Sequence, residues 1–105
     1  MIKWLLKLLG INSKTIDFKA LIKEGAIVID VRSPNEFQSG HIRKSKNIPL
    51  NELNMKYMTL KKDQPIITCC ASGVRSGSAK SFLKSKGYSK VYNGGGWMNL
   101  NGRIK

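Results

Sequence analysis

Cysteine and histidine are scarce in this sequence. Its 105 residues include two cysteines and one histidine, too few for a typical structural zinc site. The two cysteines, Cys69 and Cys70, are neighbours, so a disulfide between them would close only a small strained ring and would not join distant parts of the chain. We therefore expect neither a metal nor a cofactor, and free thiols favour the reducing cytoplasm.

Acidic residues are also few. Six Asp and Glu stand against nineteen Lys and Arg, which gives a formal net charge of +13. Charge of this sign attracts anions of every kind, from small oxyanions to acidic proteins and nucleic acid. The lysines are scattered, however, and no basic run is interleaved with aromatic residues. We therefore interpret most of the charge as a solvated surface and predict no nucleic-acid partner.

The sequence has no apolar run long enough to span a bilayer. Its first residues are apolar, with Lys3 and Lys7 on one helical face and leucines mostly opposite. We expect a leader helix over residues 1–12, which either docks on a domain of residues 13–105 or touches a membrane surface through residues 1–10. The chain is long enough for one core and not for two, and we expect a monomer.

Strand and helix patterns alternate along the rest of the chain. Continuous apolar runs, typical of strands buried on both faces, cover 26–31, 65–70 and 88–92, with a short extended piece at 47–50. Helical patterns cover 17–24, 51–58 and 76–86, and Asn51 is the expected cap of the second. Ser33, Pro34 and Glu36 form a typical helix start. The alternation predicts an α/β domain with a small, mainly parallel sheet of about four to five strands flanked by helices.

One cysteine stands where open α/β sheets carry their chemistry, between the end of a strand and the start of a helix. Cys70 ends the strand predicted over 65–70, Gly73 lies in the following loop, and Arg75 comes five residues after the cysteine. Loop amides, the helix dipole and Arg75 all favour the thiolate, so we expect the pKa of Cys70 to lie below its usual value of about 8.5. The alternative is an inert buried thiol. Strand alternation points Cys69 into packing on the other face, with a redox role as its alternative.

These features resemble the rhodanese family. The segment from Cys70 to Ser76 is similar to the family's active-site loop, in which four residues separate the cysteine from an arginine. Further similar segments follow in the right order, at Ile29–Phe37, Gly40–Ile42, Asn47–Pro49 and Gly87–Trp97. The sequence departs from the usual pattern at Ala71, where many members carry a basic or bulky residue, and at Arg43-Lys44-Ser45, where Pro-Gly-Ala is usual.

The resemblance implies a rhodanese-like single-domain sulfurtransferase. Cys70 would accept sulfane sulfur from thiosulfate or a persulfide donor and pass it from its own persulfide to a thiol or cyanide, on a small molecule or a protein. The residues that would bind the persulfide and the small anionic donor are Ala71, Ser72, Gly73, Val74 and Arg75. A sulfur carrier that passes persulfide to a partner without turnover is the alternative.

Two further predictions concern residues around this loop. Related phosphatases have five residues between cysteine and arginine, so the four found here disfavour a phosphatase or an arsenate reductase. A thiolate nucleophile and a sulfite leaving group need no proton transfer. We therefore expect Asp30, Arg32, Glu36 and His41 to hold loops rather than to act as acids or bases. The three glycines at 94–96 are expected to form a turn closed by Trp97.

Overall fold

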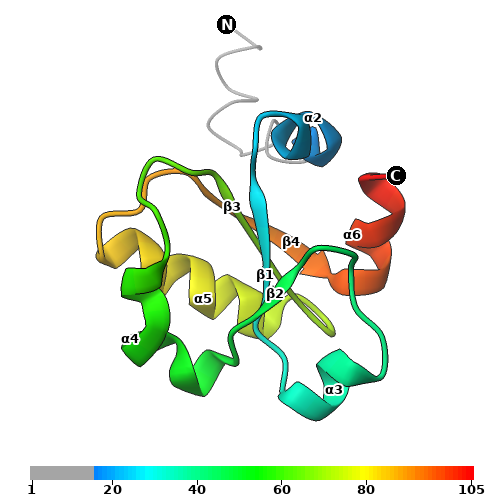
Figure 1. The fold of residues 1–105 in the computed structure, drawn as a ribbon, viewed down its shortest axis with the longest axis horizontal. Helices are drawn as coiled ribbons and strands as arrows, with labels where there is room; N and C mark the ends of the chain where they lie inside the picture. The colour runs from blue at the N-terminus through cyan, green and yellow to red at the C-terminus, as the bar shows by residue number, and fades with distance from the viewer. Residues whose placement is uncertain (1–15) are drawn as a thin grey trace, which may run out of the picture.

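The computed structural model describes residues 16–105, so the leader helix predicted over residues 1–12, with its docking or membrane contact, lies outside the described part (Figure 1). In chain order the elements are α2 (Phe18–Lys23), β1 (Ile27–Asp30), α3 (Pro34–Gln38), β2 (Lys46–Asn47), the 3-10 helix η2 (Leu50–Glu52), α4 (Leu53–Lys56), the 3-10 helix η3 (Tyr57–Thr59), β3 (Ile66–Cys70), α5 (Val74–Ser85), β4 (Val91–Gly96) and α6 (Trp97–Arg103). Within residues 16–105, no helix is long and apolar enough to cross a membrane.

Four strands form one sheet in the order β2-β1-β3-β4, and every neighbouring pair is parallel. The predicted α/β fold class is therefore confirmed. From β1 the chain moves outward to β2 on one side, and later to β3 and β4 on the other. The carboxyl ends of β1 and β3 thus flank the point where the strand order reverses, which is where open α/β sheets bind ligands. Helix α3 and the first turn of α5 lie at this end of the sheet (Figure 1).

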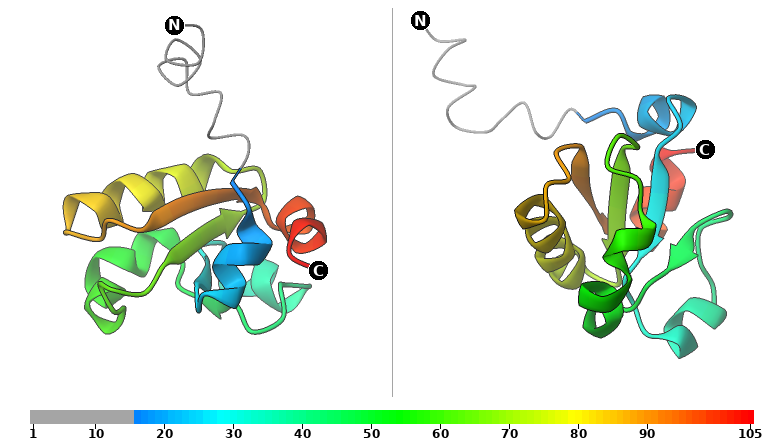
Figure 2. Two further views of the ribbon diagram at one scale, coloured as in Figure 1. Left: turned by 90° about the horizontal axis from the view of Figure 1, so that it is seen from above. Right: turned by 60° about the vertical axis from the view of Figure 1, so that its left-hand side comes forward.

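Helices cover both faces of the sheet, because alternate strand residues point to opposite sides. Cys70 belongs to the buried cluster that contains Leu83 of α5. Cys69 belongs to the cluster on the other face, with Leu100 of α6. The right-hand view of Figure 2 shows α5 on one side of the strands and α6 on the other. The prediction that the two neighbouring cysteines face opposite ways is confirmed.

The start of α3 follows from its sequence. The Ser33 hydroxyl oxygen accepts a hydrogen bond from the amide of Glu36 at 3.2 Å, and the Glu36 carboxylate accepts one from the amide of Ser33 at 3.0 Å. This reciprocal pair is a capping box, and Pro34 occupies the first helical turn as predicted. The cap also holds the Glu36 carboxylate at the end of the sheet where β1 and β3 finish.

The last strand is present with shifted bounds, and the turn predicted for the three glycines is wrong. The strand expected over 88–92 is β4, Val91–Gly96, and the three glycines are its last residues instead of a turn. Tyr88 lies outside the strand, buried in the core, where its hydroxyl donates a hydrogen bond to the carbonyl of Leu60 at 2.8 Å. Position 96 requires glycine, because a Cβ there would lie 2.9 Å from the carbonyl oxygen of Ala71.

Three of the helical segments also differ from the sequence prediction. Helix α5 begins at Val74, two residues before the expected start. The helix expected over 51–58 is divided into η2, α4 and η3, and Asn51 lies inside η2 instead of capping a helix. Helix α6 was not predicted, because its seven residues include Gly102 and two asparagines, which favour helices poorly.

Candidate active site

Cys70 is the last residue of β3, a strand that lies between β1 and β4. After it the chain turns through Ala71 and Ser72, and enters α5 from Gly73, which is the N-cap residue. Gly73 has a φ of 103°, a left-handed conformation that side chains rarely adopt, and a Cβ there would lie 3.2 Å from the Cα of Gly95. A glycine at this position therefore allows the loop to curl tightly over the sulfur.

Three groups lie within hydrogen-bonding range of the Cys70 sulfur. The amide of Gly73 donates to Sγ at 2.9 Å, and the amide of Ser76 donates at 3.4 Å. The hydroxyl oxygen of Ser76 also lies 3.4 Å from Sγ. Burial by itself raises the pKa of Cys70. Hydrogen bonds with the Ser76 hydroxyl and with the amides of Ser76, Gly73 and Ser72 have the opposite and larger effect, so the net pKa is lowered. The predicted direction of this pKa shift is confirmed.

A second layer of hydrogen bonds holds these donors in place. The Ser76 hydroxyl donates to Oδ1 of Asn93 at 2.7 Å, and the Asn93 side-chain amide donates to the carbonyl of Gly73 at 3.1 Å. The amide of Gly95 donates to the same Asn93 oxygen at 2.9 Å. Sequence reasoning missed both Ser76 and Asn93 as site residues. Ser76 offered a signal, as the residue directly after Arg75, whereas the place of Asn93 depends on the pairing of β4 with β3.

The guanidinium of Arg75, which the sequence analysis expected to favour the Cys70 thiolate, forms an ion pair with Glu36 of α3. Nη1 donates to Oε1 at 2.7 Å and Nη2 donates to Oε2 at 3.0 Å. Both side chains are 38% exposed. The hydrogen bond from Arg75, followed by that from the Ser33 amide, lowers the pKa of Glu36 to about 2. The pair therefore links α3 to the first turn of α5 and partly neutralises the arginine's charge.

Asp30 and Arg32 form a buried ion pair at the end of β1. The exposed fractions of the residues are 0% and 4%, and Nη2 of Arg32 lies 2.7 Å from the Asp30 carboxylate. The same guanidinium nitrogen donates to the carbonyl of Gly40 at 2.7 Å, and the guanidinium carbon lies 4.7 Å from the ring centre of Trp97. This arrangement holds the loop around α3, the role expected for Asp30 and Arg32.

His41 has a similar structural setting. Its ring is stacked on Phe37 with 3.7 Å between ring centres, and its Nδ1 lies 2.7 Å from the carbonyl oxygen of the same residue. These contacts fix the histidine to its own loop, in agreement with the structural role predicted for it.

Cys69 differs sharply from its neighbour. Its exposed fraction is 0%, and burial, followed by the charge of Asp30, raises the pKa of its thiol to about 12. A thiol with such a pKa stays protonated at neutral pH and is a poor nucleophile. Of the two adjacent cysteines, Cys70 has the environment of a reactive one.

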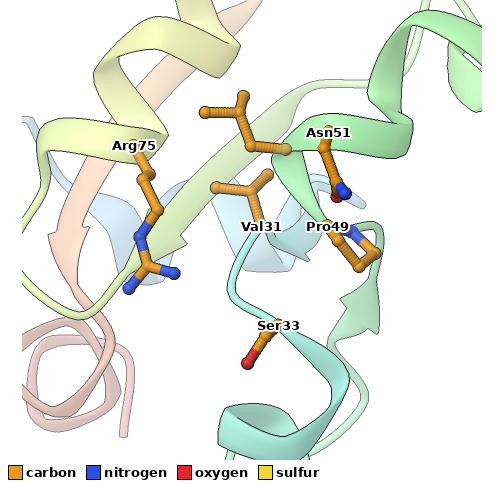
Figure 3. Close-up of a pocket in the computed structure, with 6 residues that line it drawn as sticks. Val31, Ser33, Pro49, Asn51 and Arg75 are labelled. Carbon is orange, nitrogen blue, oxygen red and sulfur yellow. The ribbon is translucent and has the colours of Figure 1, made fainter.

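A cleft of about 320 Å³ lies beside the loop. It is lined by Val31, Ser33, Pro49, Leu50, Asn51 and Arg75. In Figure 3, Arg75 stands on one side of the cleft, Pro49 and Asn51 stand on the other, and Val31 lies between them. Cys70 does not line this cleft, and its exposed fraction is 0%, so its sulfur does not contact solvent in this structure.

Comparison with known proteins agrees with this geometry. The family model for the rhodanese-like domain matches residues 15–101. The cysteine lies at the end of a parallel strand and accepts hydrogen bonds from backbone amides, in an α/β fold. The chain belongs to the rhodanese-like domain family.

Three related proteins illustrate the match. A Bacillus subtilis protein named "Uncharacterized protein YqhL" is 42% identical over 81 residues, which are 76% of this chain and 64% of that protein. The thiosulfate sulfurtransferase GlpE of Pseudoalteromonas translucida is 39% identical over 74 residues, which are 69% of each chain. A solved structure described as a rhodanese with anions, from Escherichia coli, has a TM-score of 0.68 and 35% identity, covering 71% of this chain and 91% of that one. The match thus spans less than two thirds of YqhL and nearly all of the solved rhodanese.

Proposed function

We propose that this protein is a sulfurtransferase that carries sulfane sulfur on Cys70 as a persulfide. The donor is thiosulfate or a persulfide, and the acceptor is a thiol or cyanide. The observation that carries the proposal is that the backbone amides of Gly73 and Ser76 donate hydrogen bonds to the Cys70 sulfur and lower its pKa. The likeness to a thiosulfate sulfurtransferase, GlpE, supports the same reaction.

The reaction is two-step nucleophilic catalysis. The Cys70 thiolate attacks the outer sulfur of thiosulfate, the sulfur–sulfur bond of the donor breaks, and sulfite leaves with the electron pair. Cyanide then attacks the outer sulfur of the persulfide, thiocyanate leaves, and the thiolate is restored. Neither step requires a proton to be added or removed, so we assign a structural role, and no acid–base role, to the buried Asp30 and the stacked His41.

The loop supplies the stabilisation that these steps need. The amides of Ser72, Gly73 and Ser76 form hydrogen bonds with the sulfur and would stabilise the negative charge of the thiolate and then of the persulfide. Arg75 stands at the rim of the same loop and would bind or orient an anionic donor, although its pairing with Glu36 reduces the charge that it offers. We assign the catalytic role to Cys70 and donor binding to Ala71, Ser72, Gly73, Val74 and Arg75.

The test is thiocyanate formation from thiosulfate and cyanide by purified protein. We expect the wild-type protein and Cys69→Ser to form thiocyanate, and Cys70→Ser to form none. Because Cys69 is buried on the other face of the sheet, its replacement is the matched control for loss of a thiol. Thiocyanate formation that survives in Cys70→Ser would overturn the mechanism.

A second candidate is a carrier module that passes its persulfide to one protein partner. It is favoured by the enclosure of Cys70, whose exposed fraction of 0% hinders small donors unless a partner opens the loop. A carrier would turn over thiosulfate poorly, yet would gain the mass of one sulfur on Cys70 when mixed with a persulfide donor. Efficient turnover with small substrates alone would exclude this candidate.

We place the activity in the cytoplasm and in a monomer. Both thiols are free, and a sulfurtransferase cycle requires its cysteine to return to the reduced state between turnovers. Fractionation of cells, together with light scattering of the pure protein, tests both assignments. A periplasmic or membrane fraction that contains most of the protein would contradict the first, and a dimer mass would contradict the second.

A further inference from the structure

Two adjoining hollows lie on the face of the sheet that carries Cys69, away from the candidate active site. They have volumes of about 310 and 470 Å³ and share four lining residues, Ile22, Arg43, Lys44 and Ile104, so they form one continuous groove. Ile22 of α2 and Ile104, which follows α6, both pack against the buried cluster of Cys69. Helices α2 and α6 lie side by side in Figure 1 and in both views of Figure 2. We call this feature the basic groove.

Apolar side chains line the basic groove along its length. Ile22 and Ile104 border both hollows, Ile42 borders the larger one, and Ile27 and Val28 of β1 border the smaller one. Ile22, Ile27 and Ile104 are half-buried, so part of each side chain still contacts water. An apolar group that covers these surfaces would remove them from water, which is favourable.

Positive charge stands over the same apolar lining. Arg43 and Lys44 border both hollows and are exposed, and among residues 16–105 no Asp or Glu borders either hollow. The ion pairs found within this part of the chain involve other basic residues. The two cations are therefore available to an anion that enters the groove.

The turn that holds these cations has an unusual backbone at Lys44. The amide of Ser45 donates to the carbonyl of Ile42 at 3.0 Å, so Arg43 and Lys44 are the central residues of a β-turn. Lys44 has a φ of 69°, and within residues 16–105 it is the one residue other than glycine with a positive φ. Glycine adopts this conformation without steric cost, and glycine is usual at this place in the family. A lysine here therefore points to a use for its side chain.

We infer that the basic groove binds a low-mass organic anion with an apolar body, such as an aliphatic carboxylate. The chain of this ligand lies on the isoleucines, and its acidic group meets Arg43 and Lys44. The inference is independent of the sulfurtransferase reaction, because Cys70 belongs to the buried cluster on the opposite face of the sheet.

The dimensions of the groove favour a small molecule over a protein segment. Strand β2 pairs with Ile29 and Asp30, so only two residues of β1, Ile27 and Val28, border the groove on that side, too few for an added strand. Volumes of about 310 and 470 Å³ lie within the range of small-molecule sites. An inorganic anion would use the cations and leave the isoleucines in water, so the lining fits a molecule that has both parts.

The test uses octanoate as the probe and follows the backbone amide chemical shifts of the isotopically labelled protein. Butyrate keeps the carboxylate and shortens the chain, whereas octyltrimethylammonium keeps the chain and reverses the charge. We expect octanoate to bind at least about tenfold more tightly than either compound. The amides of Ile22, Lys44 and Ile104 should shift, and those of Gly73 and Ser76 beside the Cys70 sulfur should not.

Two substitutions of one residue connect the binding to the groove. Lys44→Met keeps the apolar stem of the side chain and removes its charge, so it should weaken octanoate binding about threefold or more. Lys44→Gly should weaken binding at least as much, while its urea unfolding midpoint stays equal to that of the wild type or rises, because glycine suits the positive φ. This second variant separates lost binding from a damaged fold. Lys86→Met, at the exposed end of α5 on the opposite face, makes the same chemical change and should leave octanoate binding unaltered.

Several results would overturn the inference. Equal affinities for octanoate, butyrate and octyltrimethylammonium would show that charge and chain do not act together. Shifts that centre on the Cys70 loop, or unchanged octanoate binding in Lys44→Met and Lys44→Gly, would place the ligand elsewhere. An acidic peptide that binds at the same amides more tightly than octanoate would assign the groove to a protein partner instead.

Discussion

The hydroxyl oxygen of Ser76 lies 3.4 Å from the sulfur of Cys70, and the amide of the same serine donates to that sulfur at the same distance. One residue at the start of α5 therefore supplies two of the groups around the Cys70 sulfur. Asn93 fixes the serine from β4, because its Oδ1 accepts the serine hydroxyl at 2.7 Å. The reactivity of Cys70 is thus set by hydrogen bonds from three parts of the chain: the loop, the helix and the neighbouring strand.

Ser76→Ala should raise the pKa of Cys70. In this structure the hydroxyl proton of Ser76 goes to Asn93 Oδ1, and we expect it to turn to the sulfur 3.4 Å away when the thiolate forms, so the substitution removes a donor to the charged sulfur. The pH dependence of iodoacetamide alkylation measures this pKa and should shift to higher pH. Ser78→Ala, at an exposed position of the same helix, is the control and should leave the profile in place. An unshifted profile in Ser76→Ala would show that the amides alone hold the thiolate.

Arg75→Lys should weaken donor binding without changing the Cys70 pKa. Lysine keeps the charge but cannot form the two hydrogen bonds that fix the guanidinium against Glu36. We expect KM for thiosulfate to rise roughly fivefold, with the alkylation profile unmoved, because the donors that lower the Cys70 pKa are Ser76, Gly73 and Ser72. Arg43→Lys makes the same chemical change at an exposed position and serves as the control. An alkylation profile shifted to higher pH would instead show that Arg75 helps to stabilise the Cys70 thiolate.

The Arg75–Glu36 pair should also survive mild acid. The pKa of Glu36 is lowered to about 2, so the stability that the carboxylate contributes is present above its ordinary pKa of 4.5 and is lost only as the pH falls towards 2. The KM for thiosulfate should therefore show no change between pH 5 and pH 8 that arises from protonation of Glu36. Glu36→Gln measured over the same range provides the comparison. A wild-type KM that changes with a midpoint between these limits, and a flat profile in Glu36→Gln, would contradict this.

Asp30→Ala should destabilise the fold strongly. The substitution leaves Arg32, which is 4% exposed, buried without its carboxylate partner. Breaking one side of a buried ion pair costs about 3–5 kcal/mol in the free energy of unfolding, which urea titration measures. Asp63→Ala, at an exposed position, should change that free energy by less than about 0.5 kcal/mol. A loss below about 1 kcal/mol for Asp30→Ala would mean that Arg32 finds other partners or water.

Much of the fold follows from local sequence. The β-branched run that forms β1, the capping box at Ser33 and the strand–loop–helix order around Cys70 are all decided by residues close to one another in the chain. These signals place the thiol at the end of a parallel strand. They also separate Cys70 from Cys69, since neighbouring strand residues face opposite sides of a sheet.

The remaining features depend on contacts between distant segments. Gly96 is a strand residue because it pairs with Cys70 in the β3–β4 register, and local propensity does not encode this pairing. Asn93 reaches the site because it pairs with Thr68 in the β3–β4 register. Arg75 is engaged by Glu36, 39 residues away. The sequence alone therefore indicates the proposed nucleophile, Cys70, but not the residues that support it, because their positions depend on how the strands pair.

The central claim is that Cys70, and not Cys69, carries the transferred sulfur. The most direct measurement is the intact mass of the protein after exposure to a sulfane donor, for the wild type, Cys69→Ala and Cys70→Ala. We predict the gain of one sulfur in the wild type and in Cys69→Ala, and no gain in Cys70→Ala, because the pKa of Cys69 is raised to about 12. A sulfur gained by Cys70→Ala, or by none of the three proteins, would contradict the assignment.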